Sequence, residues 1–177
     1  MRHVTIDRVM ADQRAASFTK RSIKTTAKSS GLRLAISMVD LTTLEGKDSP
    51  QKVRALCAKA LRPDARDPSL PHVAAVCVYP ELVETAFEAL AGTSVHIASV
   101  ATGFPSGQYP LDVRLADTQR AIETGADEID MVIARGALLA GDDERVHDEI
   151  RAVKDVCDNT RTPDGDAAHL KVILETA

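Results

Sequence analysis

The chain has 177 residues, enough for one domain with a sizeable core, and its 44% hydrophobic and 27% charged residues are typical of a globular protein. A net charge of −4, an aromatic content of 3% and the absence of tryptophan argue against a nucleic-acid-binding surface. No apolar run approaches the roughly 20 residues of a membrane span, and the start of the chain lacks the apolar core of a signal peptide, so we expect a cytoplasmic protein.

The cysteines and histidines give no sign of a metal site. Cys57, Cys77 and Cys157 fall on apolar faces without Cys-x-x-Cys spacing, as buried thiols in a reducing compartment do. The five histidines have no spacing typical of metal ligands. We therefore expect neither a bound metal nor another cofactor.

The first elements in chain order are a helical leader and a strand. Residues 1–30 are polar and predict an N-terminal helical extension, in which a helix from Arg8 to Ala27 ends near Gly31. The second predicted domain covers residues 31–177. Its first strand is expected at residues 35–39, where Ala-Ile-Ser-Met-Val is mostly apolar.

Helix and strand patterns then alternate to the end of the chain. Ser49 is placed to cap a helix that has Pro50 in its first turn. A second helix opens at Pro80, and Gly125 ends a later one. The remaining strands are predicted at residues 73–79, 94–100, 128–133 and 170–175, and the remaining helices around residues 111–122 and from residue 142 onward.

Five repeats of strand and helix predict parallel strands joined by helical crossovers. Two architectures fit this pattern, an open doubly wound sheet and part of an eight-stranded (β/α)8 barrel. No Gly-x-Gly-x-x-Gly turn follows the first strand, which weakens the nucleotide-binding alternative. Side chains alternate along a strand, so Glu128, Asp130 and Val132 share one face while Ile129 and Met131 share the other. One polar and one apolar face favour the barrel.

Two charged residues interrupt strands that otherwise read as buried. Asp130 lies in Glu-Ile-Asp-Met-Val-Ile, and Lys171 lies in Leu-Lys-Val-Ile-Leu-Glu. An ionised group in such a strand is costly unless it is paired or faces a polar cavity. A carboxylate and an amine on neighbouring strands indicate proton transfer on a small molecule, and a purely structural ion pair is the alternative.

Three further residues are candidates to line the site. Asp40 and Thr42 follow the first predicted strand, at the edge where barrel active sites lie, and they are suited either to binding substrate hydroxyls or to a local turn. Cys77 points to the same face of its strand as Tyr79. A small buried thiol is the favoured interpretation, since no histidine is close in sequence to activate it.

Taken together, five ordered segments resemble the deoxyribose-phosphate aldolases, a family of class I aldolases with a (β/α)8 barrel, from about Ala35 to the last residue. The resemblance implies reversible cleavage of 2-deoxy-D-ribose 5-phosphate to D-glyceraldehyde 3-phosphate and acetaldehyde through a Schiff base, without a metal. It implies that Asp130 shuttles the proton and that Lys171 lines the site beside it. Site-lining positions match Asp40, Thr42 and Cys77. The five segments are Asp-Leu-Thr-Thr-Leu (40–44), Ala-Ala-Val-Cys-Val-Tyr-Pro (74–80), Val-Ala-Thr-Gly-Phe-Pro-Ser-Gly (100–107), Gly-Ala-Asp-Glu-Ile-Asp-Met-Val (125–132) and Leu-Lys-Val-Ile-Leu-Glu-Thr (170–176).

The sequence departs from this family after the fifth predicted strand. It contains no Phe-Ile-Lys-Thr-Ser-Thr-Gly-Lys type segment, which carries the Schiff-base lysine of the family, and no glycine-rich loops of the seventh and eighth strands. We therefore expect a barrel truncated after about the fifth strand and inactive alone. A gene fragment, a truncated polypeptide and a split enzyme all fit this pattern.

Three functions remain open on these grounds. The first is the aldolase, acting on a small phosphosugar with no nucleic-acid or membrane partner and able to form a homo-oligomer. The second is another Schiff-base phosphosugar barrel of the transaldolase type. The third is a non-catalytic fragment or subunit that a partner chain completes.

Overall fold

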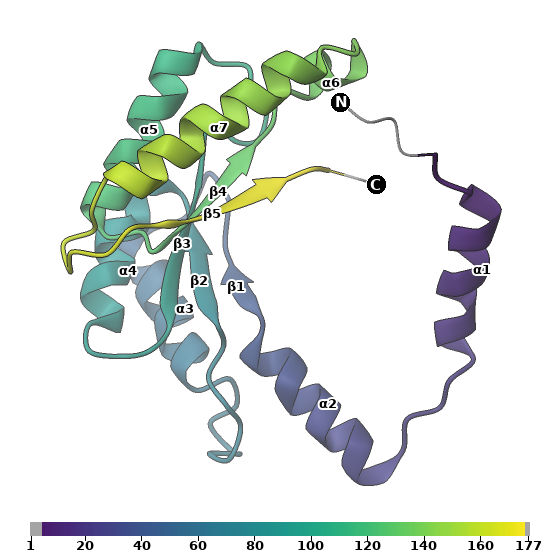
Figure 1. Ribbon diagram of the computed structural model, residues 1–177. Helices are drawn as coiled ribbons and strands as arrows, with labels where there is room; N and C mark the ends of the chain where they lie inside the picture. The colour runs from purple at the N-terminus through teal and green to yellow at the C-terminus, as the bar shows by residue number, and fades with distance from the viewer. Residues whose placement is uncertain (1–4, 176–177) are drawn as a thin grey trace. The chain divides into compact units, whose positions relative to one another are not determined.

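Five parallel strands form one sheet in the computed structural model, which describes residues 5–175 (Figure 1). They lie in the sheet in chain order, and every neighbouring pair is parallel. A doubly wound sheet reverses its strand order at a switch point, so this unbroken order confirms the barrel alternative. The strands are β1 (Asp40–Thr42), β2 (Ala75–Val78), β3 (His96–Ala101), β4 (Glu128–Val132) and β5 (His169–Ile173).

The helices precede the sheet or connect its strands. Two helices, α1 (Arg8–Thr19) and α2 (Thr25–Ser37), come before β1. The connections between strands contain the other helical elements, which are α3 (Pro50–Leu61), the short 3-10 helix η1 (Pro80–Leu82), α4 (Val83–Leu90), α5 (Leu111–Thr124), α6 (Arg135–Leu139) and α7 (Asp143–Asn159).

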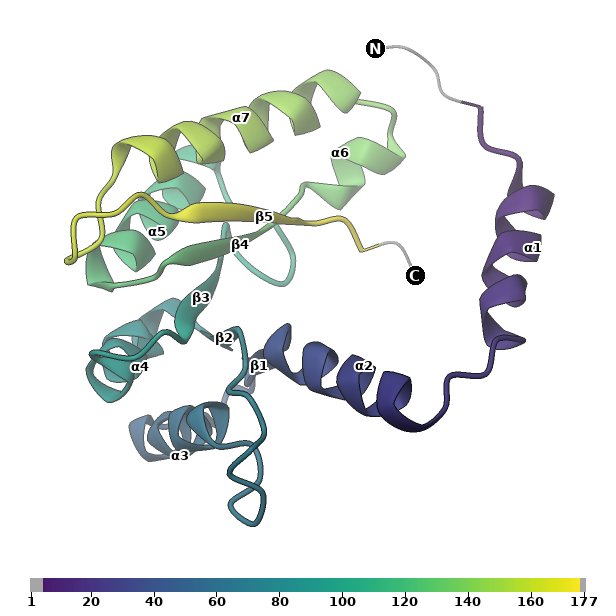
Figure 2. The same cartoon turned by 60° about the horizontal axis from the view of Figure 1, so that its bottom comes forward.

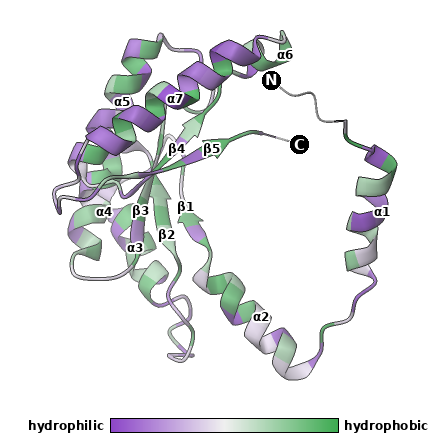
Figure 3. Ribbon diagram, viewed as in Figure 1, coloured by the Kyte–Doolittle hydropathy of each residue, from purple (hydrophilic) through white to green (hydrophobic). Residues whose placement is uncertain are grey.

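The two faces of the sheet have different neighbours. Side chains of one face, such as Val76, Ile97 and Met131, pack in a single core with α3, α4, α5 and α7. The opposite face has a small apolar group of its own, made by Ala75, Cys77, Ala98 and Val100, to which no helix among residues 5–175 contributes a buried residue. We call these the outer and the inner face. Figure 2 shows the connecting helices on one side of the strands, and Figure 3 shows mostly apolar strands and helices that contain both hydrophilic and hydrophobic residues.

Local sequence signals fix several helix ends. Ser49 caps α3, because its hydroxyl accepts a hydrogen bond from the backbone N–H of Lys52 (3.3 Å), and Pro50 occupies the first turn as expected. Gly125 ends α5 with a φ of 122°, a region that favours glycine. A Cβ atom at this position would lie 2.5 Å from the ring of Phe87, so the contact between α5 and α4 also requires glycine.

The chain divides into two units between residues 35 and 36. The first unit contains α1 and most of α2, and no residue of either helix is buried. The second unit contains the sheet. The predicted boundary between residues 30 and 31 stays a prediction, and residues 1–4 and 176–177 of the two predicted domains lie outside the described residues.

The sequence interpretation was wrong in the region before β1. The expected strand at residues 35–39 is largely the end of α2, and the strand is Asp40–Thr42. The expected single helix is two helices, and Gly31 lies inside the second. A short apolar run fits a helix as well as a strand, and tertiary pairing with β2 decides which residues form β1. The short helix α6 was not predicted.

Candidate active site

The inner face brings together charged side chains from three strands. Alternation along β4 directs Glu128 and Asp130 to the same face, and Asp130 lies opposite Lys171 of β5 in the strand register. Asp40, the first residue of β1, meets the same lysine although it lies 131 residues away in the sequence. We call Asp40, Glu128, Asp130 and Lys171 the charged cluster.

Lys171 is the centre of the charged cluster. Its Nζ donates a hydrogen bond to Asp40 Oδ2 at 2.6 Å and lies 2.7 Å from Glu128 Oε2 and 3.0 Å from Asp130 Oδ1. The ammonium therefore faces one carboxylate for each of its three N–H groups. The expected convergence of Asp130 and Lys171 on one face is confirmed.

The cluster is partly shielded from water. The side chains of Asp130 and Glu128 are 17% and 20% exposed, and that of Lys171 is 31% exposed. Burial opposes the charged form of Lys171, but the contacts with Asp40, Glu128 and Asp130 outweigh it and raise the pKa of Lys171 above its ordinary value. Lys171 is therefore an ammonium at neutral pH and has no free lone pair with which to attack a carbonyl.

The two oxygens of Asp130 have different environments. Asp130 Oδ1 is buried and makes no hydrogen bond of good geometry, although it lies within ion-pair distance of Lys171 Nζ. The other oxygen, Oδ2, accepts a weak hydrogen bond from Cys77 Sγ at 3.6 Å. A buried polar atom without a hydrogen-bond partner is unusual in a folded protein, and Asp130 Oδ1 shares this feature with Arg114 Nε among the described residues.

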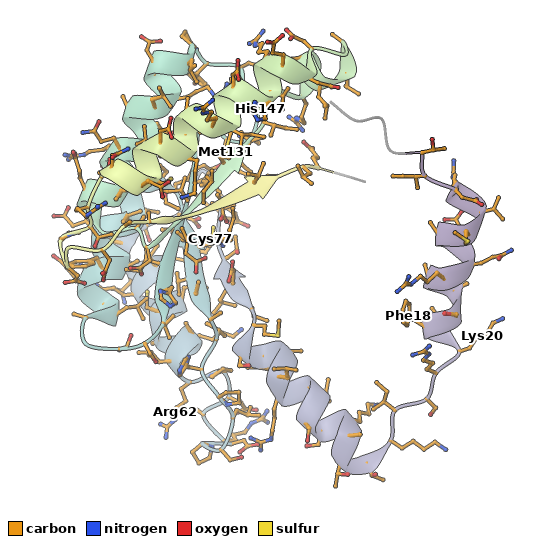
Figure 4. The ribbon with its side chains drawn as sticks, in the orientation of Figure 1. Phe18, Lys20, Arg62, Cys77, Met131 and His147 are labelled. Atoms are coloured by element: carbon orange, nitrogen blue, oxygen red, sulfur yellow. The ribbon has the colours of Figure 1, made fainter. Side chains whose placement is uncertain are left out.

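Cys77 lies beside the cluster as a thiol. It is 3% exposed on the inner face of β2, and Figure 4 labels it together with Met131, which belongs to the outer face of β4. Burial, and next the charge of Asp130, raise the pKa of Cys77 to about 12. The thiol thus donates to Asp130 and is not an activated nucleophile, in agreement with the favoured interpretation of the sequence.

Thr42 has a different environment from the other four predicted residues. It is exposed, and its hydroxyl donates to the backbone oxygen of Asp40 at 2.9 Å. Its predicted contact with substrate stays a prediction.

Glu128 is a member of the cluster that the sequence analysis did not select. The signal was present, because Glu128 is two residues from Asp130 and therefore shares its face. What the sequence did not reveal is that its carboxylate reaches Lys171, which lies diagonally across the β4–β5 pair.

The glycine-rich segment after β3 shapes the rim of the inner face. Thr102 ties the end of β3 to β4, because its hydroxyl donates to Val132 O and accepts from Val132 N. A hollow of about 280 Å³ lies beside this segment, with Tyr79, Phe104 and Asp117 in its lining. The rings of Tyr79 and Phe104 meet edge to face at 6.1 Å and pack against the inner apolar group. The hollow contains no member of the charged cluster but adjoins its face.

Residues 5–175 contain neither a group of metal-ligand side chains nor a membrane-spanning helix. There, no group of three or more histidine, cysteine, aspartate or glutamate side chains is placed to hold a metal ion. No helix in this part of the chain is both long and apolar enough to cross a membrane.

Comparison with known proteins identifies relatives for most of the chain. Residues 34–176 match the model of the DeoC/LacD family aldolases. The human and mouse deoxyribose-phosphate aldolases are 41% and 42% identical over 167 residues, which cover 89% of this chain and 50% of each relative. The solved structure of the tetrameric deoxyribose phosphate aldolase from Aeropyrum pernix superposes with a TM-score of 0.60 at 26% identity, covering 81% of this chain and 53% of that one. The chain thus spans about half the length of the curated relatives that it matches.

Proposed function

The chain belongs to the DeoC/LacD aldolase family, and we propose that its inner face provides the proton-transfer part of a deoxyribose-phosphate aldolase site. The reaction is the reversible cleavage of 2-deoxy-D-ribose 5-phosphate to D-glyceraldehyde 3-phosphate and acetaldehyde. The observation that carries this proposal is the pairing of Asp130 with Lys171 on the inner face. The names of the human and mouse relatives support the choice of substrate.

The chemistry requires an imine, a base and a fixed cation. The C1 aldehyde of the sugar condenses with a lysine amine, and the protonated imine accepts the electron pair when the C2–C3 bond breaks. Asp130 takes the proton of the C3 hydroxyl as C3 becomes the aldehyde of D-glyceraldehyde 3-phosphate. The remaining enamine is protonated at C2, and hydrolysis of its imine releases acetaldehyde. Lys171, whose Nζ lies 3.0 Å from Asp130 Oδ1, is the fixed cation beside this base.

Lys171 takes part as a cation in this scheme and does not form the imine. Three carboxylates hold its ammonium, so the lone pair needed for attack on the aldehyde is absent. The imine-forming lysine belongs to a segment that these 177 residues do not contain. We therefore expect the 177-residue polypeptide alone to show no turnover and no borohydride-trapped acetaldehyde adduct on Lys171, as measured by a coupled assay and peptide mass spectrometry.

A chimera provides the direct test of substrate and reaction. Residues 36–177 of this chain replace the matching part of human deoxyribose-phosphate aldolase, which is 41% identical. The chimera is expected to release acetaldehyde from 2-deoxy-D-ribose 5-phosphate, with the human enzyme as the positive control. A folded chimera that leaves this sugar intact would contradict the proposal.

The same chimera separates the aldolase from the transaldolase-type alternative. Turnover is compared between 2-deoxy-D-ribose 5-phosphate and fructose 6-phosphate, since a transaldolase-type site uses the second sugar. Preference for fructose 6-phosphate would replace the proposed function by the alternative.

The cellular setting of the reaction belongs to the same proposal. We place the complete enzyme in the cytoplasm, in the degradation of deoxyribose phosphates, and the three free cysteines are consistent with a reducing compartment. The tetramer of the Aeropyrum pernix relative supports a homo-oligomer, which light scattering on the complete protein tests.

A further inference from the structure

Glu128 holds Lys171 from a direction that neither Asp40 nor Asp130 provides. Asp130 lies directly opposite Lys171 in the register, and Asp40 approaches from β1. Glu128 lies one pleat earlier on β4 and pairs with His169, so its longer side chain reaches Lys171 diagonally. Contacts from three directions fix the end of a side chain that otherwise has many rotamers.

We propose that Glu128 is a positioning residue that, together with Asp40, holds the ammonium of Lys171 in place beside Asp130, the proposed acceptor of the proton from the reacting hydroxyl. This inference rests on the proposed function for its catalytic consequence, but the state of Lys171 can be measured without turnover. Its basis is geometric, because Glu128 Oε2 lies 2.7 Å from Nζ, closer than Asp130 Oδ1 at 3.0 Å.

The neighbours of Lys171 define what Glu128 contributes. The charged groups that face its ammonium are Asp40 from β1 and Asp130 and Glu128 from β4. β2 contributes the Cys77 thiol, which donates to Asp130. β3 presents Ala98 and Val100, which carry no charge. His169 of β5 is exposed. Glu128 is therefore one of three carboxylates that favour the protonated form of Lys171.

Without Glu128, the ammonium of Lys171 would have two carboxylate partners in place of three. Its remaining anionic partners would be Asp40 and Asp130, and a lysine side chain released from one contact moves toward the others. Nζ would then move closer to Asp130 Oδ1, which already lies 3.0 Å away, and would bind this carboxylate more tightly. The same loss of negative charge lowers the pKa of Lys171. Glu128 thus affects both the protonation of the lysine and the availability of the aspartate.

Chemical modification of the lysines in the 177-residue chain tests the first effect. The chain is acetylated with acetic anhydride over a range of pH, and peptide mass spectrometry gives the rate at Lys171 and at exposed Lys59. We expect the pH midpoint of Lys171 to lie above that of Lys59. Glu128→Gln, nearly the same shape without the charge, is expected to raise the rate at Lys171 about tenfold at fixed pH, which corresponds to a pKa lower by about one unit.

The controls separate charge from folding. Glu144→Gln removes one negative charge from an exposed position of α7 and is expected to leave Lys171 unchanged. Glu128→Asp keeps the charge on a shorter side chain and is expected to give an intermediate rate. Circular dichroism shows whether Glu128→Gln folds. If it does not fold, the role of Glu128 is tested by Glu128→Asp and by a direct 15Nζ titration of Lys171 in the wild type.

The possible outcomes distinguish this inference from the proposed function. Equal midpoints for Lys171 and Lys59, or a Lys171 rate unaffected by Glu128→Gln or by Glu128→Asp, would overturn the role of Glu128. In the chimera, Glu128→Gln is expected to reduce kcat and to move the alkaline limb of the pH profile to lower pH, with Glu128→Asp restoring part of both. An inactive chimera with the expected labelling would overturn the proposed function while the holding of Lys171 by Glu128 stands.

Discussion

Two groups of ionised side chains lie on opposite faces of the sheet and differ in burial and in charge balance. In the helix layer, Arg114 of α5 pairs with Glu149 of α7 at 2.8 Å, and their side chains are 1% and 8% exposed. Arg145 Nε pairs with the other carboxylate oxygen of Glu149 at 2.9 Å. On the inner face, three carboxylates surround Lys171 and remain partly open to water.

This difference separates an ion pair that holds elements together from one suited to chemistry. Both oxygens of Glu149 accept hydrogen bonds from arginines and so join α5 to α7, although Arg114 Nε is buried without a hydrogen-bond partner. The charged cluster has more carboxylates than cations, and the side chains of Lys171 and Asp40 are 31% and 35% exposed. Perturbed groups of this second kind are typical of active sites.

The largest expected effect on activity comes from Asp130. Asp130→Asn in the chimera with the human aldolase is expected to lower kcat about 1000-fold, within the usual range for loss of a general acid–base group. The urea concentration at the unfolding midpoint of this variant is expected to change little from that of the unmodified chimera. Asp112→Asn, at an exposed position of α5, is the matched control and should retain full activity. Retention of most of the activity by Asp130→Asn would remove Asp130 from the proton transfer.

Loss of the Arg114–Glu149 ion pair is expected to lower the stability of the protein. Arg114→Leu leaves Glu149 buried without its main partner and should lower the free energy of unfolding by about 3 kcal/mol at pH 7. Burial opposes the charged form of Glu149, but hydrogen bonds from Arg114 and Arg145 outweigh it and lower its pKa. The contribution of Glu149 is therefore present above its unfolded pKa of about 4.3 and is lost as the pH falls through the folded value.

Urea denaturation from pH 7 to pH 3 checks both parts of this expectation. The difference in the free energy of unfolding between wild type and Arg114→Leu should decrease toward pH 3. Arg145→Gln provides the control, because its side chain is 58% exposed and its loss should cost less than about 1 kcal/mol. If the two arginine variants lose equal amounts of unfolding free energy, burial does not set the contribution of these ion pairs.

Removal of the central cation is expected to have a smaller effect on stability. Lys171→Met leaves three carboxylates without their cation and should cost roughly 1–2 kcal/mol at pH 7, between the values for exposed and buried pairs. Because the pKa of Lys171 is raised on folding, its contribution is fully present below the unfolded value of about 10.4 and is lost as the pH rises through the folded value. The difference between wild type and variant, measured by urea denaturation, should therefore shrink at strongly alkaline pH. A constant difference would indicate that packing, and not charge, accounts for the loss.

The smallest expected effect concerns Cys77. Burial and the charge of Asp130 raise its pKa to about 12, so iodoacetamide at pH 8 should modify it slowly. Asp130→Asn removes the nearby charge and is expected to increase the rate a few-fold, while burial, the larger cause, remains. Mass spectrometry follows the modification, with Cys57, buried and away from the cluster, as the internal reference. A rate that Asp130→Asn leaves unchanged would mean that the carboxylate does not act on the thiol.

Patterns within single elements predicted much of the barrel unit. Hydrophobic periodicity placed the strands near their observed positions, and the cap at Ser49 and the end of α5 at Gly125 reflect local chemistry. The prediction for the region before β1 was wrong, because a short run of apolar residues is compatible with both helix and strand. Only pairing with the neighbouring strand decides between them. Glu128 was on the correct face but was not recognised, since its reach to Lys171 depends on the register of two strands.

The sequence by itself determined which side chains share a face of each strand, because alternation is a property of the extended backbone. It therefore placed Asp130 with Glu128, and it assigned apolar residues to the helix-covered side. Only the tertiary structure decided that Asp40 meets Lys171 across 131 residues of chain and that one lysine serves three carboxylates. The physical reason is that strand order, register and sheet curvature, which bring distant charges into hydrogen-bonding range, arise from packing between elements and are encoded in no single segment.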